Sequence, residues 1–287
     1  MSTLTPQPTP PELTEDADRA PRWPAWYAPA AFGAALVVVA VTVAVLAAAV
    51  AAAGGEVDGS TPGLTVAGTL VQDATLVAAA LVFASLRLRP RTWHFGLRRT
   101  SFWPALGWTV VAVVGFYLTA ASYTAIVEPA GEQTVLEDLG AERGTLLLLM
   151  SAVLVVGIAP FAEELFFRGF FYGALRTRFG VWSAAGLNGL LFGAIHYSGP
   201  DTLGILPPLA VLGFVLCLLY ERTGSLYPVI AFHSLNNAIA FAAQVGGTGA
   251  LAALAVGCLA TGGCLVAAGR QRHAPLPFGK RQWAGAR

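Results

Sequence analysis

Charged side chains are scarce in this chain of 287 residues: 11% of the residues are charged and 56% are hydrophobic, with a mean hydropathy of +0.65. A soluble domain normally carries about 25% charged residues. The composition therefore predicts an integral membrane protein, with the lipid bilayer as its first partner. Lys280 is the single lysine, and the excess of arginine, alanine, glycine and valine is typical of a GC-rich bacterial genome. The net charge of +1 gives no reason to expect a nucleic-acid partner.

Several catalytic signatures are also absent. The sequence has no HExxH pair, which excludes a zinc-protease helix of the soluble type, and no GxSxG nucleophile elbow. Its three cysteines lack CxxC spacing and are expected to be small core residues. No phosphate-binding loop occurs among the 32 glycines, which we expect to let membrane helices approach closely.

Eight apolar runs have the length of a membrane-spanning helix, which needs about 17 to 25 apolar residues. They predict an all-α, polytopic membrane protein. The fourth helix is expected to continue beyond its apolar run, to about Arg178. The expected spans are 30–53, 64–86, 105–127, 144–162, 181–197, 203–220, 226–244 and 248–268.

Positive charges alternate along the connections between these spans. Arginines gather after the second, fourth, sixth and eighth spans, whereas the connections after the first and third are mainly acidic. By the positive-inside rule, both termini then face the cytoplasm, as an even number of spans requires. We expect a multi-pass protein of the cell inner (plasma) membrane. Residues 1–25, rich in proline and acids, are expected to be a disordered tail.

Glu163, Glu164 and Arg168 place three charged groups inside one of the most apolar stretches of the chain. Each charge at that depth costs about 2.5–3.5 kcal/mol, so such residues indicate a functional site. Glu164 and Arg168 are four residues apart and share one helix face, from which Glu163 is rotated by about 100°. We expect Arg168 to neutralise one carboxylate while the other faces a cavity. A structural ion pair of Glu164 and Arg168 alone would leave Glu163 uncompensated.

Two histidines in other spans, His196 and His233, are the natural partners of these acids. His196 follows Phe192 by four residues, and His233 precedes Asn237 by four. Two chemistries stay open. Glu163, His196 and His233 bind a metal such as zinc with one position left for water, or a glutamate and a histidine activate water without a metal, while His233 and Asn237 donate to the oxyanion. Both hydrolyse an amide.

Other buried polar residues carry less weight. Asp73 falls inside the second span and is expected to line a cavity or to pair with an arginine. Asn188 and Asn236 are expected to form hydrogen bonds between helices.

Three motifs in this order resemble the CAAX prenyl protease and bacteriocin-processing (CPBP) family, the type II CAAX endopeptidase-like intramembrane proteases. The resemblance covers roughly residues 145–245. It rests on Glu-Glu-xxx-Arg at 163–168, Phe-xxx-His at 192–196 and His-xxx-Asn at 233–237, with Phe-Arg-Gly-Phe at 167–170 and Gly-Ser-Leu-Tyr-Pro at 224–228.

The resemblance implies a helical fold whose eight spans enclose a catalytic cavity open to the cytoplasm. It implies an intramembrane endopeptidase of the metalloendopeptidase class that acts on a membrane-associated peptide or protein. Zinc and a metal-independent glutamate mechanism stay equally open. Glu163 would be the water-activating base, and the supporting residues would be Glu164, Arg168, His196, His233 and Asn237.

The expected organisation has four parts: the tail 1–25, the first transmembrane helices at 26–140, the catalytic core at 141–245, and the last helix with a basic cytoplasmic tail at 246–287. Two other functions use the same polar residues. One is a non-proteolytic membrane scaffold or chaperone. The other is a proton-coupled transporter, for which the chain shows no inverted repeat.

Overall fold

The computed structural model describes residues 23–55, 61–128 and 135–270, and all regular structure in these residues is helical. The expected tail thus falls outside the described residues except for its last three. Trp23, at the end of that tail, is a correction: it is 1% exposed and stacks on Phe95, with ring centroids 5.3 Å apart. The basic tail beyond residue 270 also lies outside the described part.

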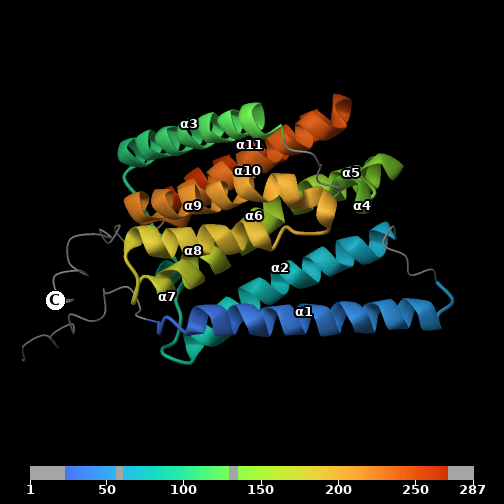
Figure 1. Ribbon diagram of the computed structural model, residues 1–287, viewed down its shortest axis with the longest axis horizontal. Coiled ribbons are helices and arrows are strands. Elements are labelled where there is room, and N and C mark those ends of the chain that lie inside the picture. Colours follow the sequence, from blue (N-terminus) through green and yellow to red (C-terminus); the bar gives the residue numbers. More distant parts are fainter. Residues whose placement is uncertain (1–22, 56–60, 129–134, 271–287) are drawn as a thin grey trace, which may run out of the picture.

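The described helices run back and forth along one long axis (Figure 1). The first three rods are α1 (Tyr27–Ala52), α2 (Pro62–Ser85) and α3 (Phe102–Val127). A continuous rod follows, made of α5 (Thr145–Ala152), η4 (Val153–Ile158), α6 (Ala159–Glu164), η5 (Leu165–Tyr172) and α7 (Gly173–Leu175). The last four rods are α8 (Val181–Ala194), α9 (Leu206–Thr223), α10 (Leu226–Val245) and α11 (Gly247–Arg270); the short pieces are η2 (Thr92–Phe95), α4 (Val135–Asp138), η3 (Ala141–Arg143) and η6 (Pro200–Ile205).

Six of these rods are long and apolar enough to cross a membrane, as expected for a polytopic membrane protein. They are Tyr27–Ala52, Pro62–Ser85, Phe102–Val127, Thr145–Leu175, Pro200–Thr223 and Gly247–Arg270. Two of the eight expected spans fall short of this standard. Helix α8 has only 14 residues, or about 21 Å, and α10 carries a histidine and two asparagines along its 20 residues.

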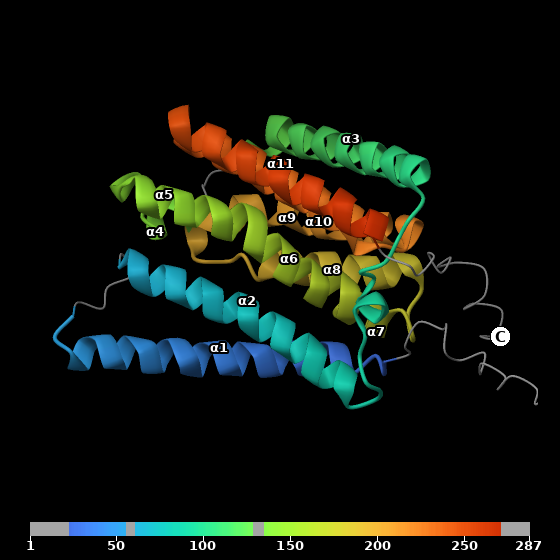
Figure 2. The ribbon, with the colours of Figure 1, turned by 180° about the vertical axis from the view of Figure 1, so that it is seen from behind.

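The two ends of the bundle differ. Helix α1 begins and α11 ends at the same end of the bundle, beside the connections that contain η2, residues 176–180 and residues 224–225 (Figures 1 and 2). The first two connections carry the arginines that follow the second and fourth expected spans, and Arg222, which follows the sixth, lies in the last turn of α9 beside the third connection. The observed alternation of helix direction therefore matches the charge pattern of the sequence.

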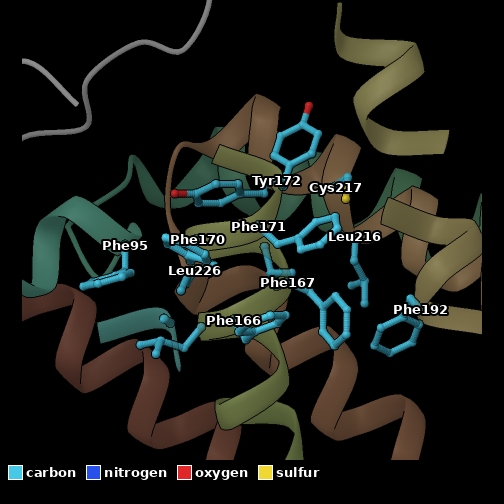
Figure 3. Close-up of a cluster of buried hydrophobic side chains, with 14 of the residues drawn as sticks. Phe95, Phe166, Phe167, Phe170, Phe171, Tyr172, Phe192, Leu216, Cys217 and Leu226 are labelled. Carbon is cyan, nitrogen blue, oxygen red and sulfur yellow. The ribbon is translucent and has the colours of Figure 1, made fainter. Parts of the chain in front are cut away.

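Helix η5 forms the centre of the core. All of its residues are buried, and its phenylalanines fan out toward neighbouring helices (Figure 3). Phe166 packs edge-to-face on Phe167, which meets Phe192 of α8 with ring centroids 5.4 Å apart. Residues immediately after Glu163 and Glu164 are thus fixed by aromatic packing on several sides, which holds both carboxylates in place.

Helices α8 and α9 approach closely because glycines line their contact. A Cβ atom on Gly213 would lie 2.8 Å from the Cβ of Phe192 and 3.0 Å from the Cα of Gly189. Real Cβ contacts are longer than this, so only glycine fits at position 213. The close approach also brings the Gly213 carbonyl within reach of Arg168.

The connection before α10 is tied to the loop that follows η2. Gly224 takes a left-handed conformation (φ 62°) at the end of α9, and Ser225 caps α10 by accepting a hydrogen bond from the Tyr227 amide. The Ser225 hydroxyl also donates to the Arg98 carbonyl at 2.7 Å, while the Arg98 side chain donates to the Gly224 carbonyl. This turn sets the start of α10, the helix that carries His233.

Candidate active site

Glu163 and Glu164 lie on α6, a short α-helical stretch between the two π-helical stretches η4 and η5. A π-helical carbonyl pairs with the amide five residues further along. For Val155 that position is Pro160, which has no N–H. The Asn237 side chain donates to the Val155 carbonyl instead, over 3.0 Å. π-Helical turns are frequent at functional sites because they rotate the following side chains relative to a regular helix.

Glu164 contacts two basic side chains of the site. Its Oε1 accepts a hydrogen bond from Arg168 Nη1 at 2.7 Å and lies 2.7 Å from His233 Nδ1. The contact between Glu164 and Arg168 confirms the ion pair expected from their spacing. Both side chains are fully buried. Because a carboxylate paired with arginine only accepts, Nδ1 of His233 carries a proton. Glu164 therefore fixes the His233 tautomer, as a third group orients the base in many catalytic triads.

Arg168 is held from three sides. Its Nη2 donates to the Gly213 carbonyl at 3.1 Å, and its guanidinium carbon lies 4.5 Å from the centroid of the Phe192 ring. Stacking on an aromatic face stabilises a desolvated guanidinium. Arg168 is therefore committed to Glu164 and leaves Glu163 without a cationic partner of its own.

Glu163 differs from its neighbour in both accessibility and partners. Its side chain keeps 10% exposure, and its Oε2 has no hydrogen-bond partner in the described residues. The nearest basic atom is His233 Nε2, 3.8 Å from Oε2. This distance is too long for a direct hydrogen bond. Glu163 Oε2 and the outer nitrogen of His233 thus lie side by side without a hydrogen bond between them.

His196 stands at the end of α8 and is half-buried. Its Nδ1 lies 2.7 Å from the Phe192 carbonyl, so this nitrogen carries the proton and Nε2 is free. The Phe192 ring contacts both histidines, with centroids 5.0 Å from His196 and 5.6 Å from His233. The structure therefore places the two imidazoles around one aromatic ring.

Asn237, expected to stabilise the oxyanion, binds the backbone of η4 in the structure. Its Nδ2 holds η4 through the Val155 carbonyl, and its Oδ1 accepts from Asn236 Nδ2 at 3.4 Å. One N–H of Asn237 remains available. Asn236 in turn accepts from the Tyr117 hydroxyl of α3 at 3.1 Å, which confirms it as an interhelical hydrogen-bonder.

A catalytic zinc site needs three protein ligands, and the candidates here are Glu163, His196 and His233. Over residues 23–55, 61–128 and 135–270, no three His, Cys, Asp or Glu side chains lie together closely enough to hold a metal ion. Nδ1 of His233 is engaged by Glu164 and Nδ1 of His196 by a backbone carbonyl, as is common in metal-binding histidines, so only the two Nε2 atoms could serve as ligands. In this arrangement Glu163, His196 and His233 do not fit a three-ligand zinc site.

Two supporting interactions were not foreseen from the sequence. Arg176, one of the arginines after the fourth expected span, is buried and forms a two-point ion pair with Glu221 of α9, through Nε at 3.1 Å and Nη2 at 2.8 Å. Tyr172 donates to the same carboxylate at 2.9 Å. Asn188 was expected to bond between helices, and it donates to the Phe167 carbonyl of η5 at 2.8 Å. The sequence does not indicate the partners of these residues, because the partners lie on other helices, far away along the chain.

Two cavities of about 810 Å³ each flank the site. The α3 cavity lies between α3, α10 and α11, with Arg99 at one end and Tyr117 and Asn236 deeper inside. The α2 cavity lies between α2, α6, α10 and α11, and Asp73 and Ala162 form part of its wall. Asp73, expected to line a cavity or to pair with an arginine, thus does the first.

The central part of the chain is similar to a known protein family. Residues 145–239 match the family model described as "Type II CAAX prenyl endopeptidase Rce1-like". The uncharacterized protein YpbD of Bacillus subtilis (strain 168) is 34% identical over 88 residues, which are 31% of this chain and 42% of YpbD. The chain thus spans less than half the length of this relative. No solved structure matches the chain. The matched residues contain Glu163, Glu164, His196 and His233, whereas Asp73 lies outside them.

Proposed function

Starting from the Rce1-like type II CAAX prenyl endopeptidase domain at residues 145–239, we propose that the protein is an intramembrane endopeptidase in which Glu163 activates the attacking water. The observation that carries this proposal is the division of labour between adjacent carboxylates. Glu164 is fully buried and its Oε1 is bound to Arg168 and His233, whereas Glu163 keeps 10% side-chain exposure, forms no ion pair with Arg168, and places its unpartnered Oε2 3.8 Å from His233 Nε2.

Glu163 acts first as a base and then as an acid. It takes one proton from a water whose oxygen attacks the carbonyl carbon of the peptide bond. When the carbon–nitrogen bond breaks, the same carboxyl group gives its proton to the leaving nitrogen. Oε2 of Glu163 has no competing donor in the described residues, so it is available for both transfers.

His233 and Asn237 stabilise the charge on the carbonyl oxygen. They are four residues apart and occupy one face of α10. His233 presents Nε2 on the side of Glu163 because Nδ1 donates to Glu164; as an imidazolium it also donates from Nε2, and the Glu164 carboxylate offsets that charge. Asn237 keeps one N–H after binding Val155. Donors fixed before the reaction stabilise a developing oxyanion better than water does. His196 orients the water from the half-exposed side, through its free Nε2.

The substrate is a membrane-associated peptide or protein. The two flanking cavities are large enough for side chains, and the α3 cavity reaches Asn236, the neighbour of Asn237. It is also lined by Arg99, which belongs to the arginine-rich connection expected on the cytoplasmic side. The proposed setting is therefore a bacterial inner membrane crossed by the six long apolar rods, with both termini on the cytoplasmic side.

The test is cleavage of a peptide library by the purified full-length protein in lipid nanodiscs. Wild-type protein should release defined products, whereas Glu163→Gln and His233→Ala should reduce kcat by at least about a thousandfold while remaining folded. Glu142→Gln, which changes an exposed carboxylate outside the site, is the matched control and should keep wild-type activity. Equal cleavage by wild type and Glu163→Gln would exclude Glu163 as the base.

Metal dependence is decided in the same assay. Metal analysis of the protein as purified is combined with cleavage before and after chelation. The metal-independent glutamate mechanism predicts unchanged kcat after chelation. Loss of activity that zinc restores would instead show a metal site formed by a rearrangement of Glu163, His196 and His233. A membrane scaffold without proteolytic activity would release no products in any arm.

A further inference from the structure

Asp73 is a buried charge that the proposed reaction does not use. It lies in the middle of α2, is 2% exposed, and neither of its carboxylate oxygens has a hydrogen-bond partner in the described residues. Burying a carboxylate without a partner is costly. Such a group indicates a ligand that is bound only part of the time.

Asp73 faces the α2 cavity. It belongs to a stripe of α2 residues at helical spacing that line this cavity together with Leu70, Ala74, Val77 and Leu81. The other described residues of the wall are aliphatic or aromatic, apart from the thiol of Cys264 and the phenol of Tyr227. Asp73 is therefore the one charged group among the described residues lining a cavity of about 810 Å³.

Glu163 adds to the negative charge at this place. The α2 cavity is lined by Phe161 and Ala162, the two residues before Glu163, and the carboxylates of Asp73 and Glu163 are near enough for their charges to act on each other. Arg168 does not offset them because it is paired with Glu164. His233 lies 3.8 Å from Glu163, and no cation is recorded against Asp73 in the described part of the chain.

We propose that the α2 cavity is a substrate subsite for a cationic nitrogen, with the Asp73 carboxylate as its counter-ion. This inference rests on the proposed peptidase function and names the specificity of that same site. The apolar walls fit the aliphatic stem of a lysine or arginine side chain, whose charged head reaches Asp73. A free amino terminus offers the same chemistry from a second source.

Other occupants suit the cavity less well. A purely apolar side chain would leave Asp73 buried without a partner, and an acidic side chain would meet two like charges in surroundings of low dielectric constant. A cation instead gains a charge-assisted hydrogen bond to Asp73 and weakens the repulsion between Asp73 and Glu163.

The test compares peptides that differ at one position. A cleaved peptide is made with lysine, norleucine or glutamate at each position around the cleaved bond, with either a free or an acetylated amino terminus. At one position wild-type protein should prefer lysine over norleucine by about tenfold or more in kcat/KM, and reject glutamate. If only the free amino terminus gives this preference, the terminus is the source of the cation.

Asp73→Asn should reduce the lysine-to-norleucine ratio to below about two, mainly through KM, whatever its total activity. Gln72→Leu is the matched control, because Gln72 is exposed on the same helix and is not among the residues lining the cavity. It should keep the wild-type ratio. An unchanged ratio in Asp73→Asn, or a wild-type protein without charge preference, would overturn the proposal.

If Asp73→Asn does not fold, inhibition of the wild-type protein by small amphiphiles tests the same proposal. n-Hexylammonium should inhibit cleavage of the norleucine peptide competitively, at a concentration at least about tenfold lower than n-hexanol. Equal inhibition by the two compounds would contradict a cation subsite. Absence of cleavage of every peptide would instead count against the proposed peptidase function, so the two failures are distinguishable.

Discussion

Substitution of the adjacent carboxylates Glu163 and Glu164 by glutamine should affect the stability of the protein to very different extents. Glu164→Gln keeps the size of the side chain but removes the charge that compensates Arg168 and His233. Glu164 and Arg168 are fully buried, and Glu164 Oε1 lies 2.7 Å from both Arg168 Nη1 and His233 Nδ1. Removing one partner of a buried ion pair costs about 3–5 kcal/mol, because the other charge stays buried. Glu163→Gln breaks no hydrogen bond recorded for Glu163, and we expect a change within about 0.5 kcal/mol.

Thermal unfolding in detergent, followed by tryptophan fluorescence, measures the difference. At about 2–4 °C per kcal/mol, Glu164→Gln should lower the midpoint by about 10 °C, whereas Glu163→Gln should stay within about 2 °C of wild type. Both variants should lose cleavage activity, Glu163→Gln by loss of the base and Glu164→Gln by loss of the fixed His233 tautomer. The double variant Glu164→Gln/Arg168→Met should recover part of the stability and none of the activity. Equal midpoints for Glu163→Gln and Glu164→Gln would refute the assignment of distinct roles.

Three further predictions concern the surroundings of the site. Gly213→Val should destabilise the protein and reduce activity, because even a Cβ atom would lie 2.8 Å from the Phe192 Cβ; Tm and kcat on the same sample measure this. Asn188→Leu should lower Tm by several degrees, since it removes the 2.8 Å hydrogen bond to the η5 backbone, and an unchanged Tm would contradict that role. Outside the membrane-spanning helices, burial and then the charge of Arg91 lower the pKa of His94 to about 4 from 6.5. The unfolded chain thus binds more protons between pH 4 and 6.5, so the stabilising contribution of neutral His94 is complete above about pH 6.5 and is lost as the pH falls toward 4. The Tm difference between wild type and His94→Gln should shrink over this range.

Much of the site follows from local spacing. The separation of four residues between Glu164 and Arg168 predicts their contact, and the same rule relates His196 to Phe192 and His233 to Asn237. The apolar runs predict the helical rods because apolar length is set by the bilayer. Helix α8 falls short of a full span, since the chain turns after residue 194, before His196. Helix α10 carries the polar site residues and is less apolar for that reason.

Interactions between distant segments could not be predicted in this way. Nothing near Arg176 in the sequence indicates Glu221, 45 residues away, as its partner. In the π-helical stretch η4, the Val155 carbonyl faces Pro160, which has no N–H, and the side chain of Asn237 from α10 supplies the donor instead. The contact of Asp73 with a cavity depends on how α2 packs against α6 and α11. These features arise from tertiary packing, which a single sequence does not display.

The most direct test of the central claim is the cleavage of a single identified peptide in water enriched in oxygen-18. Wild-type protein in nanodiscs should place one labelled oxygen in the new carboxyl terminus, and Glu163→Gln should yield no labelled product although its Tm is unchanged. Labelled product formed by Glu163→Gln at the wild-type rate would contradict the role of Glu163 as the group that activates water.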